Sequence, residues 1–221
     1  MGSIACSRIL QRAARTLFDE TGVRWPPAEL LDYLNAGIGA IVAAKPDVAA
    51  TAQPFELVGG SRQDLPQDFI QFLGLTRNLG ADGATPGRAI RQVERNELDH
   101  GYPDWHSATG EAVLHYCHDR RLPRLFYVFP AAAGWVELQG VKAPAEIVDA
   151  AETLPLDDLY ENPLHNWVVA YAYAKSSKSG DMNRSGAYMT LFANALGLKS
   201  QLQFSFAPTD PDVAARSGED N

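Results

Sequence analysis

Apolar residues recur at helical spacing near both ends of the chain, whereas proline and glycine break up the region between them. Two such stretches lie at about residues 4–20 and 26–44, and two more at about 163–176 and 182–196. A repeat of three to four residues places apolar side chains on one face of a helix. We therefore expect helices on both sides of an inserted region of different structure.

Proline and glycine mark where these helices should begin and end. Gly22 stands where the first helix is expected to stop, and Gly197 occupies the same place after the last one. Pro26 and Pro27 suit the first turn of the second helix, because their missing N–H donors would be unpaired there in any case. Pro46 ends that helix, since the residue before a proline is disfavoured in helical conformation.

The inserted region, at about residues 50–143, predicts a small antiparallel sheet. Three β-rich runs lie at about residues 113–118, 125–129 and 135–138, at the spacing of an antiparallel meander. The run Leu125–Phe129 is apolar on both faces, so we expect it to be a central strand.

Shorter segments of the inserted region have weaker patterns. Phe55–Val58 predicts a strand and Arg88–Val93 an extended piece, whereas Asp68–Leu75 predicts a short helix and Glu94–His100 a helical turn. The whole pattern indicates an α+β fold: an α-helical bundle of the N-terminal helix pair and a C-terminal αα-hairpin, with the sheet inserted as a subdomain.

The chain ends in a segment that this fold does not need. After Lys199, the residues Leu202, Phe204 and Phe206 alternate with polar residues before a Pro- and Asp-rich end. Such a pattern predicts an extended strand, which is more useful to a binding partner than to the fold itself. We therefore divide the chain into a domain of residues 1–199 and a C-terminal extension of residues 200–221.

Composition excludes several classes of protein. Apolar residues make up 46% of the 221 residues and charged residues 21%, which excludes wholesale disorder, collagen and a long coiled coil. No apolar stretch reaches the roughly 18 to 20 residues of a membrane span, and the first twenty residues lack the apolar run of a signal peptide. We expect a soluble protein, made in the cytoplasm, with Cys6 and Cys117 as reduced thiols.

The net charge of -8 comes mainly from the last third of the chain. Its densest part contains six acidic residues without an intervening Lys or Arg: Glu146, Asp149, Glu152, Asp157, Asp158 and Glu161. A solvated acidic face is one interpretation. The other is a surface that lies near DNA without gripping it, because a basic surface would bind phosphates and release their counterions.

Residues with catalytic or metal-binding chemistry form no recognisable motif. The spacing of His115, Cys117 and His118 is not that of a zinc site, and on a strand His118 would point away from the other two. No nucleophile elbow, phosphate-binding loop or dinucleotide fingerprint is present. We therefore expect neither enzymatic activity nor a cofactor, with two alternatives left open: a peptidoglycan hydrolase using Glu94 or Glu97, and a metal-binding regulator using the His115–His118 cluster.

A loose succession of apolar and aromatic motifs resembles the head–tail adaptor proteins of tailed bacteriophages over most of residues 4–199. These motifs are Trp25-Pro26-x-x-Glu29-Leu30-Leu31-x-Tyr33-Leu34-Asn35, Lys45-Pro46-Asp47, Asp64-Leu65-Pro66, Leu98-Asp99 with Pro103-Asp104-Trp105, Phe126-Tyr127-Val128-Phe129-Pro130, Tyr171-Ala172-Tyr173-Ala174-Lys175, and Ala187-Tyr188 with Phe192.

The resemblance implies a structural virion protein at the head–tail interface. Such adaptors form a ring, normally a dodecamer, beneath the portal protein; the ring continues the DNA channel toward a downstream tail or nozzle protein, and DNA passes without sequence-specific binding. Their C-terminal extension reaches the portal, which would make Leu202, Phe204 and Phe206 the portal-binding residues. The acidic stretch Glu146–Glu161 is then a candidate for the channel wall.

Overall fold

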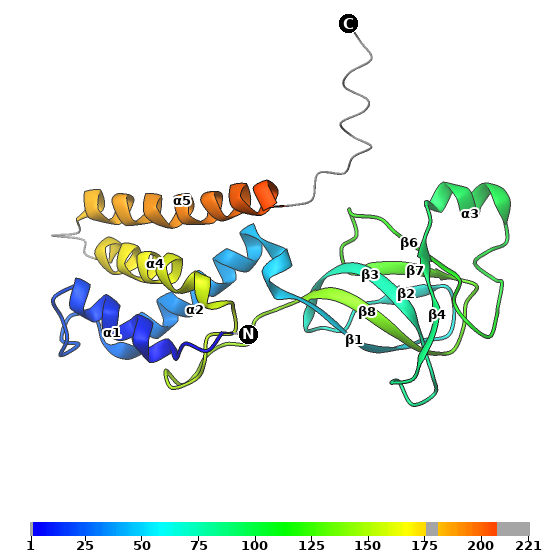
Figure 1. Ribbon diagram of the computed structural model, residues 1–221, viewed down its shortest axis with the longest axis horizontal. Coiled ribbons are helices and arrows are strands. Elements are labelled where there is room, and N and C mark those ends of the chain that lie inside the picture. Colours follow the sequence, from blue (N-terminus) through cyan, green and yellow to red (C-terminus); the bar gives the residue numbers. More distant parts are fainter. Residues whose placement is uncertain (1, 176–180, 207–221) are drawn as a thin grey trace, which may run out of the picture. The chain divides into compact units, whose positions relative to one another are not determined.

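The fold divides into two compact units, which are described separately. The computed structural model describes residues 2–175 and 181–206, with side chains as far as Gly197. The first unit, here the helical unit, comprises Met1–Ile41 and Glu146–Asn221, and the second, the sheet unit, comprises Val42–Ala145. The mixed α+β class predicted from the sequence is confirmed (Figure 1).

The helices begin close to the predicted positions, but α5 continues ten residues past its predicted end at residue 196. They are α1 (Cys6–Thr16), α2 (Pro27–Ala44, whose last three residues belong to the sheet unit), the short 3-10 helix η2 (Asp158–Tyr160), α4 (Glu161–Ala174) and α5 (Met182–Phe206). No helix of the described residues is long and apolar enough to cross a membrane.

Helix α4 is the element on which the other helices of its unit pack. From α2, Gly37 lies so close that an added Cβ would stand 2.7 Å from Cδ1 of Trp167. From α5, the ring of Phe192 lies 4.8 Å from that of Trp167. Trp25 donates a hydrogen bond from Nε1 to the Ala172 carbonyl at 2.9 Å. Trp167 is thus covered from two sides, by α2 and by α5.

The first helix ends earlier than Gly22 indicates. Phe18 has a φ of 57° and takes the left-handed position that follows the helix, and the Asp19 N–H donates to the Ala14 carbonyl at 3.0 Å. Glycine normally fills this position, because a Cβ is strained there. Gly22, with a φ of 68°, lies in the following loop instead.

The sheet unit contains two four-stranded sheets. Their strands are ordered β1-β8-β3-β4 and β2-β7-β6-β5. The bounds are β1 (Ala50–Leu57), β2 (Arg62–Asp64), β3 (Phe69–Leu79), β4 (Pro86–Ala89), β5 (Arg91–Gln92), β6 (His115–His118), β7 (Leu125–Phe129) and β8 (Gly134–Lys142), with the 3-10 helix η1 (Pro46–Ala49) and helix α3 (Arg95–Gly101). The predicted strand at Phe55–Val58, the extended piece at Arg88–Val93 and the helical turn at Glu94–His100 correspond to β1, to β4 with β5, and to α3.

The helix predicted over Asp68–Leu75 is wrong, because this segment forms strand β3. Phe69, Phe72 and Leu75 are buried, a spacing of three that imitates a helix. The register of β3 against β8 shifts between Phe69 and Gln71 and again between Phe72 and Gly74. Each such irregularity adds a residue to the alternation, so buried positions fall three apart in a strand.

The predicted three-strand meander is only partly correct. Strand β7 does pair antiparallel with β6 and lies centrally, between β2 and β6. Strand β8, however, joins the other sheet, where it pairs along the whole of β1 and with β3. These two ladders are longer than any that β7 could offer, so more backbone groups are paired in this arrangement.

A core of thirteen buried residues from both sheets fills the sheet unit. At its centre the rings of Phe72 and Phe126 are stacked 4.4 Å apart. A smaller cluster of Leu98, Trp105 and Cys117 lies under α3, against Tyr127 and Phe129 of β7. Both faces of β7 are therefore covered by apolar groups, as its sequence predicts.

Candidate functional site

Three regions could carry function: the C-terminal end of α5, the acidic stretch Glu146–Glu161, and a hollow in the sheet unit. The strand predicted over Leu202, Phe204 and Phe206 is wrong, because α5 continues as a helix through Gly197 to Phe206. The alternation of two and the helical repeat of four coincide at Leu202 and Phe206, so the sequence fits both conformations. The Pro- and Asp-rich residues 207–221 of the predicted extension lie outside the described residues.

Helix α5 is longer than α4, the helix on which it packs. It has 25 residues, whereas α4 has 14. The difference of eleven residues corresponds to about 16 Å of helix. Tyr188 and Phe192 pack on Tyr173 and Trp167 of α4 in the first half of α5. Helix α5 is therefore about three turns longer than α4, and Leu202 and Phe206 belong to its last part.

The outer face of α5, turned away from α4, carries no charge. No charged residue occurs between Ser185 and Leu198, although Gly186, Thr190, Asn194 and Gly197 are exposed. An exposed helix face normally carries charged and polar residues. The outer face of α2 is similar beyond the exposed Asp32: no charged residue occurs between Tyr33 and Ala44, and Ala36 and Gly39 are exposed. Neither face was predicted from the sequence, although the uncharged runs are visible there.

Three glycines on these two faces have no explanation within the described part of the chain. An added Cβ at Gly39, Gly186 or Gly197 would meet nothing within 4 Å among the described residues. A glycine inside a helix costs about 1 kcal/mol relative to alanine. The close contact of Gly37 with Trp167 accounts for that glycine, but no packing contact within the described residues accounts for the other three.

The acidic stretch has mainly local partners in the structure. Glu152 accepts hydrogen bonds from the N–H groups of Val148 and Asp149, at 3.1 and 2.9 Å, and Asp149 accepts one from Ala151 at 2.9 Å. Asp157 caps η2 by accepting from the Leu159 N–H at 2.8 Å. These carboxylates fix the turns that lead into α4. Glu146 is exposed.

The two remaining acidic residues bind the N-terminal segment. Asp158 accepts hydrogen bonds from the Ser3 N–H and hydroxyl, both at 2.7 Å, and from the Ile4 N–H at 3.2 Å. The hydrogen bonds from Ser3 are the main reason that the pKa of Asp158 lies below its usual value. Glu161 pairs with Arg8 at 3.1 Å. Asp158 and Glu161 thus hold α1 and the residues before it in place.

Replacing Asp158 with asparagine should loosen this attachment. An amide accepts hydrogen bonds more weakly than a carboxylate does, because the charge of the carboxylate strengthens them. We expect protection of the Ser3 and Ile4 amides from hydrogen exchange to fall by roughly tenfold. An unchanged exchange rate at both amides would show that Asp158 does not hold this segment.

His165 is buried where α1, α4 and α5 meet. It is 5% exposed, and its Nε2 lies 3.1 Å from the hydroxyl of Thr16 in α1. Thr16 also donates a hydrogen bond to the Arg12 carbonyl at 3.0 Å, and Nδ1 of His165 lies 3.3 Å from the side-chain oxygen of Asn166. Burial first, and the charge of Arg12 second, lower the pKa of His165 below 6.5.

Stability should therefore fall in weak acid. The unfolded chain takes up a proton at an ordinary histidine pKa, whereas the folded chain does so only at a lower pH. The contribution of His165 is complete above pH 6.5 and decreases below it, until the folded-state pKa is passed. Urea unfolding at several pH values should show this slope, and His165→Gln should flatten it. A slope unchanged in the variant would contradict the assignment.

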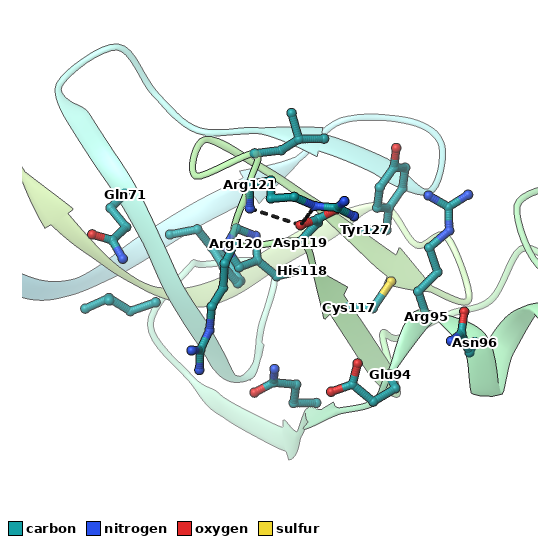
Figure 2. A pocket seen from close by; sticks show the side chains of 14 residues that line it. Gln71, Glu94, Arg95, Asn96, Cys117, His118, Asp119, Arg120, Arg121 and Tyr127 are labelled. Carbon is teal, nitrogen blue, oxygen red and sulfur yellow. Dashed lines mark hydrogen bonds and ion pairs between the residues drawn. The ribbon is translucent and has the colours of Figure 1, made fainter.

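The hollow in the sheet unit has a volume of about 820 Å³. Figure 2 shows Arg121 paired with Asp119 on one side, and Arg95 and Asn96 near the start of α3 on another, around Cys117. Two hydrogen bonds of 2.8 and 3.0 Å join Arg121 to the two carboxylate oxygens of Asp119 and hold the pKa of that carboxyl at about 2. Asp119 is therefore an ionised partner of an arginine, unsuited to donating a proton near neutral pH.

The structure brings together only some of the residues predicted for the two alternative functions, the peptidoglycan hydrolase and the metal-binding regulator. Glu94 lines the hollow, whereas Glu97 is not one of its lining residues. Cys117 lies in the cluster with Leu98 and Trp105, and its burial raises the pKa of the thiol to about 11. His118 lies on the other face of β6, where its ring is 4.9 Å from that of Phe72 and its Nδ1 donates to the Leu125 carbonyl.

These positions do not form a metal cluster. His115 stacks on Phe129, on the same side of β6 as Cys117, while His118 points away, as predicted for a strand. Among the residues that the structure describes, no group of three or more His, Cys, Asp or Glu side chains could hold a metal ion.

Comparison with known proteins provides the family. No curated protein matches the chain. The family model described as SU10 adaptor protein matches residues 5–213, which is nearly the whole chain and includes both structural units. This agrees with the resemblance to phage adaptors over residues 4–199. The chain therefore belongs to the SU10 adaptor protein family, whose members are structural adaptor proteins of phages.

Proposed function

We propose that the protein is a head–tail adaptor of the virion, which forms a ring beneath the portal and joins it to the tail. The observation that carries this proposal is the family match over residues 5–213. The ring, normally a dodecamer in such adaptors, continues the DNA channel toward a downstream tail or nozzle protein. It retains packaged DNA and lets it pass at ejection, so the work of the protein is mechanical.

The C-terminal end of α5, together with residues 200–221, is the proposed portal-binding element. The length of α5 supports this, because the helix is eleven residues longer than α4, on which it packs. A helix that leaves its own fold can lay its apolar residues into a groove of a partner. Leu202 and Phe206 share one face of such a helix, and Phe204 lies on the other side.

The acidic stretch Glu146–Glu161 is proposed to face the channel. Hydrogen bonds from Ser3 hold the pKa of one of its carboxyls, that of Asp158, below the usual value. Only Glu161 has arginine partners, Arg8 and Arg12, among the ion pairs of the described residues. The segment therefore stays negative, and negative charge prevents DNA from sticking to the channel wall.

Sedimentation of the purified chain with portal assemblies tests the proposal. We expect the wild-type chain to co-sediment with the portal in a fixed ratio, and a chain lacking residues 200–221 to remain unbound. The circular dichroism of the truncated chain should show only the loss of the last helical turns, so that the rest of the chain is still folded. A wild-type chain that never co-sediments would refute the proposed function. A truncated chain that still binds would refute only the assignment of the C-terminal element.

A further inference from the structure

The outer faces of α5 and α2 are unpartnered within the described part of the chain, and they match one another. The outer face of α5 is uncharged from Gly186 to Gly197, and that of α2 from Ala36 to Ala44, one turn after the exposed Asp32. Each stretch carries an exposed glycine, Gly186 or Gly39, whose Cα is open to close approach. Trp167 of α4 packs against Gly37 of α2 and against Phe192 of α5, so α4 separates the two helices at this level and their outer faces point away from it. Small residues at helical spacing let the backbone of another helix approach closely.

We propose that the outer face of α5 in one copy packs on the outer face of α2 in the next copy. The proposal rests on the proposed ring and identifies the surfaces that close it. A contact between two different faces of the same chain is heterologous, and such contacts form rings when the rotation closes. Gly186, Thr190 and Gly197 of one copy would lie against Ala36 and Gly39 of its neighbour.

The charge of the chain favours a second copy as the occupant. Each copy has a net charge of -8, so two copies repel one another wherever acidic residues face each other. A contact between copies therefore requires surfaces free of negative charge. The segment from Ser185 to Leu198 and the segment from Tyr33 to Ala44 both meet this requirement.

The size of the contact predicts when it forms. Seven residues of α5 between 185 and 197 are exposed, whereas a stable interface takes about 20 to 30 residues from each partner. Two free copies should therefore stay apart, and the contact should form when the portal holds many copies side by side, which raises their effective concentration.

Chemical crosslinking of rings assembled on the portal tests the interface. The native thiols Cys6 and Cys117 are buried, at 0% and 2% exposure, and give a low background. In a chain carrying both Gly39→Cys and Thr190→Cys, a short bismaleimide should link neighbours into a ladder of dimers, trimers and larger species. Either single variant should give no ladder, and an equal mixture of the two single variants should give dimers only.

Bulky substitutions give a second readout. Gly39→Leu and Gly186→Leu should leave the melting temperature of the free chain unchanged or higher and reduce ring assembly at least tenfold. Gly101→Leu, at an exposed glycine of α3 that also meets nothing within 4 Å, is the matched control and should assemble normally. Rings that form without crosslinks, or that tolerate both leucines, would overturn this interface while leaving the adaptor function intact. Failure of the wild-type chain to form a layer on the portal would instead refute the adaptor function, and this interface with it.

Discussion

Replacing Leu202 or Phe206 with serine is expected to weaken binding to the portal by at least about a hundredfold, whereas Phe204→Ser should leave binding nearly unchanged. The reason is the helix that extends to Phe206. Residues 202 and 206 are four apart and share one face of it, and residue 204 is turned to the opposite side. Affinity for immobilised portal, measured for the three full-length variants, checks this expectation.

The three variants also distinguish a helix from a strand. In an extended segment Leu202, Phe204 and Phe206 would all lie on one face, and the three substitutions would weaken binding alike. Equal losses would therefore contradict a helical docking element. Three harmless substitutions would show that this end of α5 does not bind the portal at all. Gln203→Ser, between the apolar positions, is the control for a nonspecific effect on the helix.

The second large effect is expected at Gly37. A side chain there would collide with the ring of Trp167, because even a Cβ would lie 2.7 Å from Cδ1. We expect Gly37→Leu to cost about 3 kcal/mol or more of stability, since overpacking forces α2 and α4 apart. Thermal or urea unfolding, followed by circular dichroism, measures this loss.

Gly39 is the matched control, two residues along the same helix. Its Cα faces open space, so Gly39→Ala should stabilise the free chain by about 0.5 to 1 kcal/mol. The two variants thus differ in sign. Equal destabilisation at both positions would contradict the packing of α2 on α4 through Gly37, and with it the separation of an inner and an outer face of α2.

The helices could be predicted because their apolar repeat is regular and proline marks their limits. The starts of α2 and α4 lie within about two residues of the prediction. The end of α1 could not be predicted, because Phe18 takes a left-handed position for which glycine is the usual signal. The sequence of β3 predicts a helix, because its buried residues lie three apart. This spacing results from irregularities in the pairing of β3 with β8, a partner about seventy residues away that the local sequence does not reveal.

Candidate functional residues could be predicted by type but not by environment. The six acidic residues were evident as a negative run, yet nothing in the run showed that Asp158 holds Ser3 and Ile4, which are about 155 residues away in the sequence. The helical form of the α5 end was missed because its apolar residues fit two periodicities. The uncharged runs of α2 and α5 are visible in the sequence. Only the structure shows which positions in these runs are exposed and therefore form an outer face.

Imaging of the purified chain mixed with its portal tests the central claim most directly. Negative-stain class averages of the mixture should show one added annular layer on the portal, coaxial with its channel, that is missing from averages of the portal alone. Portal particles that look the same with and without the protein, at concentrations where both are intact, would contradict the proposal that this chain is a ring-forming adaptor.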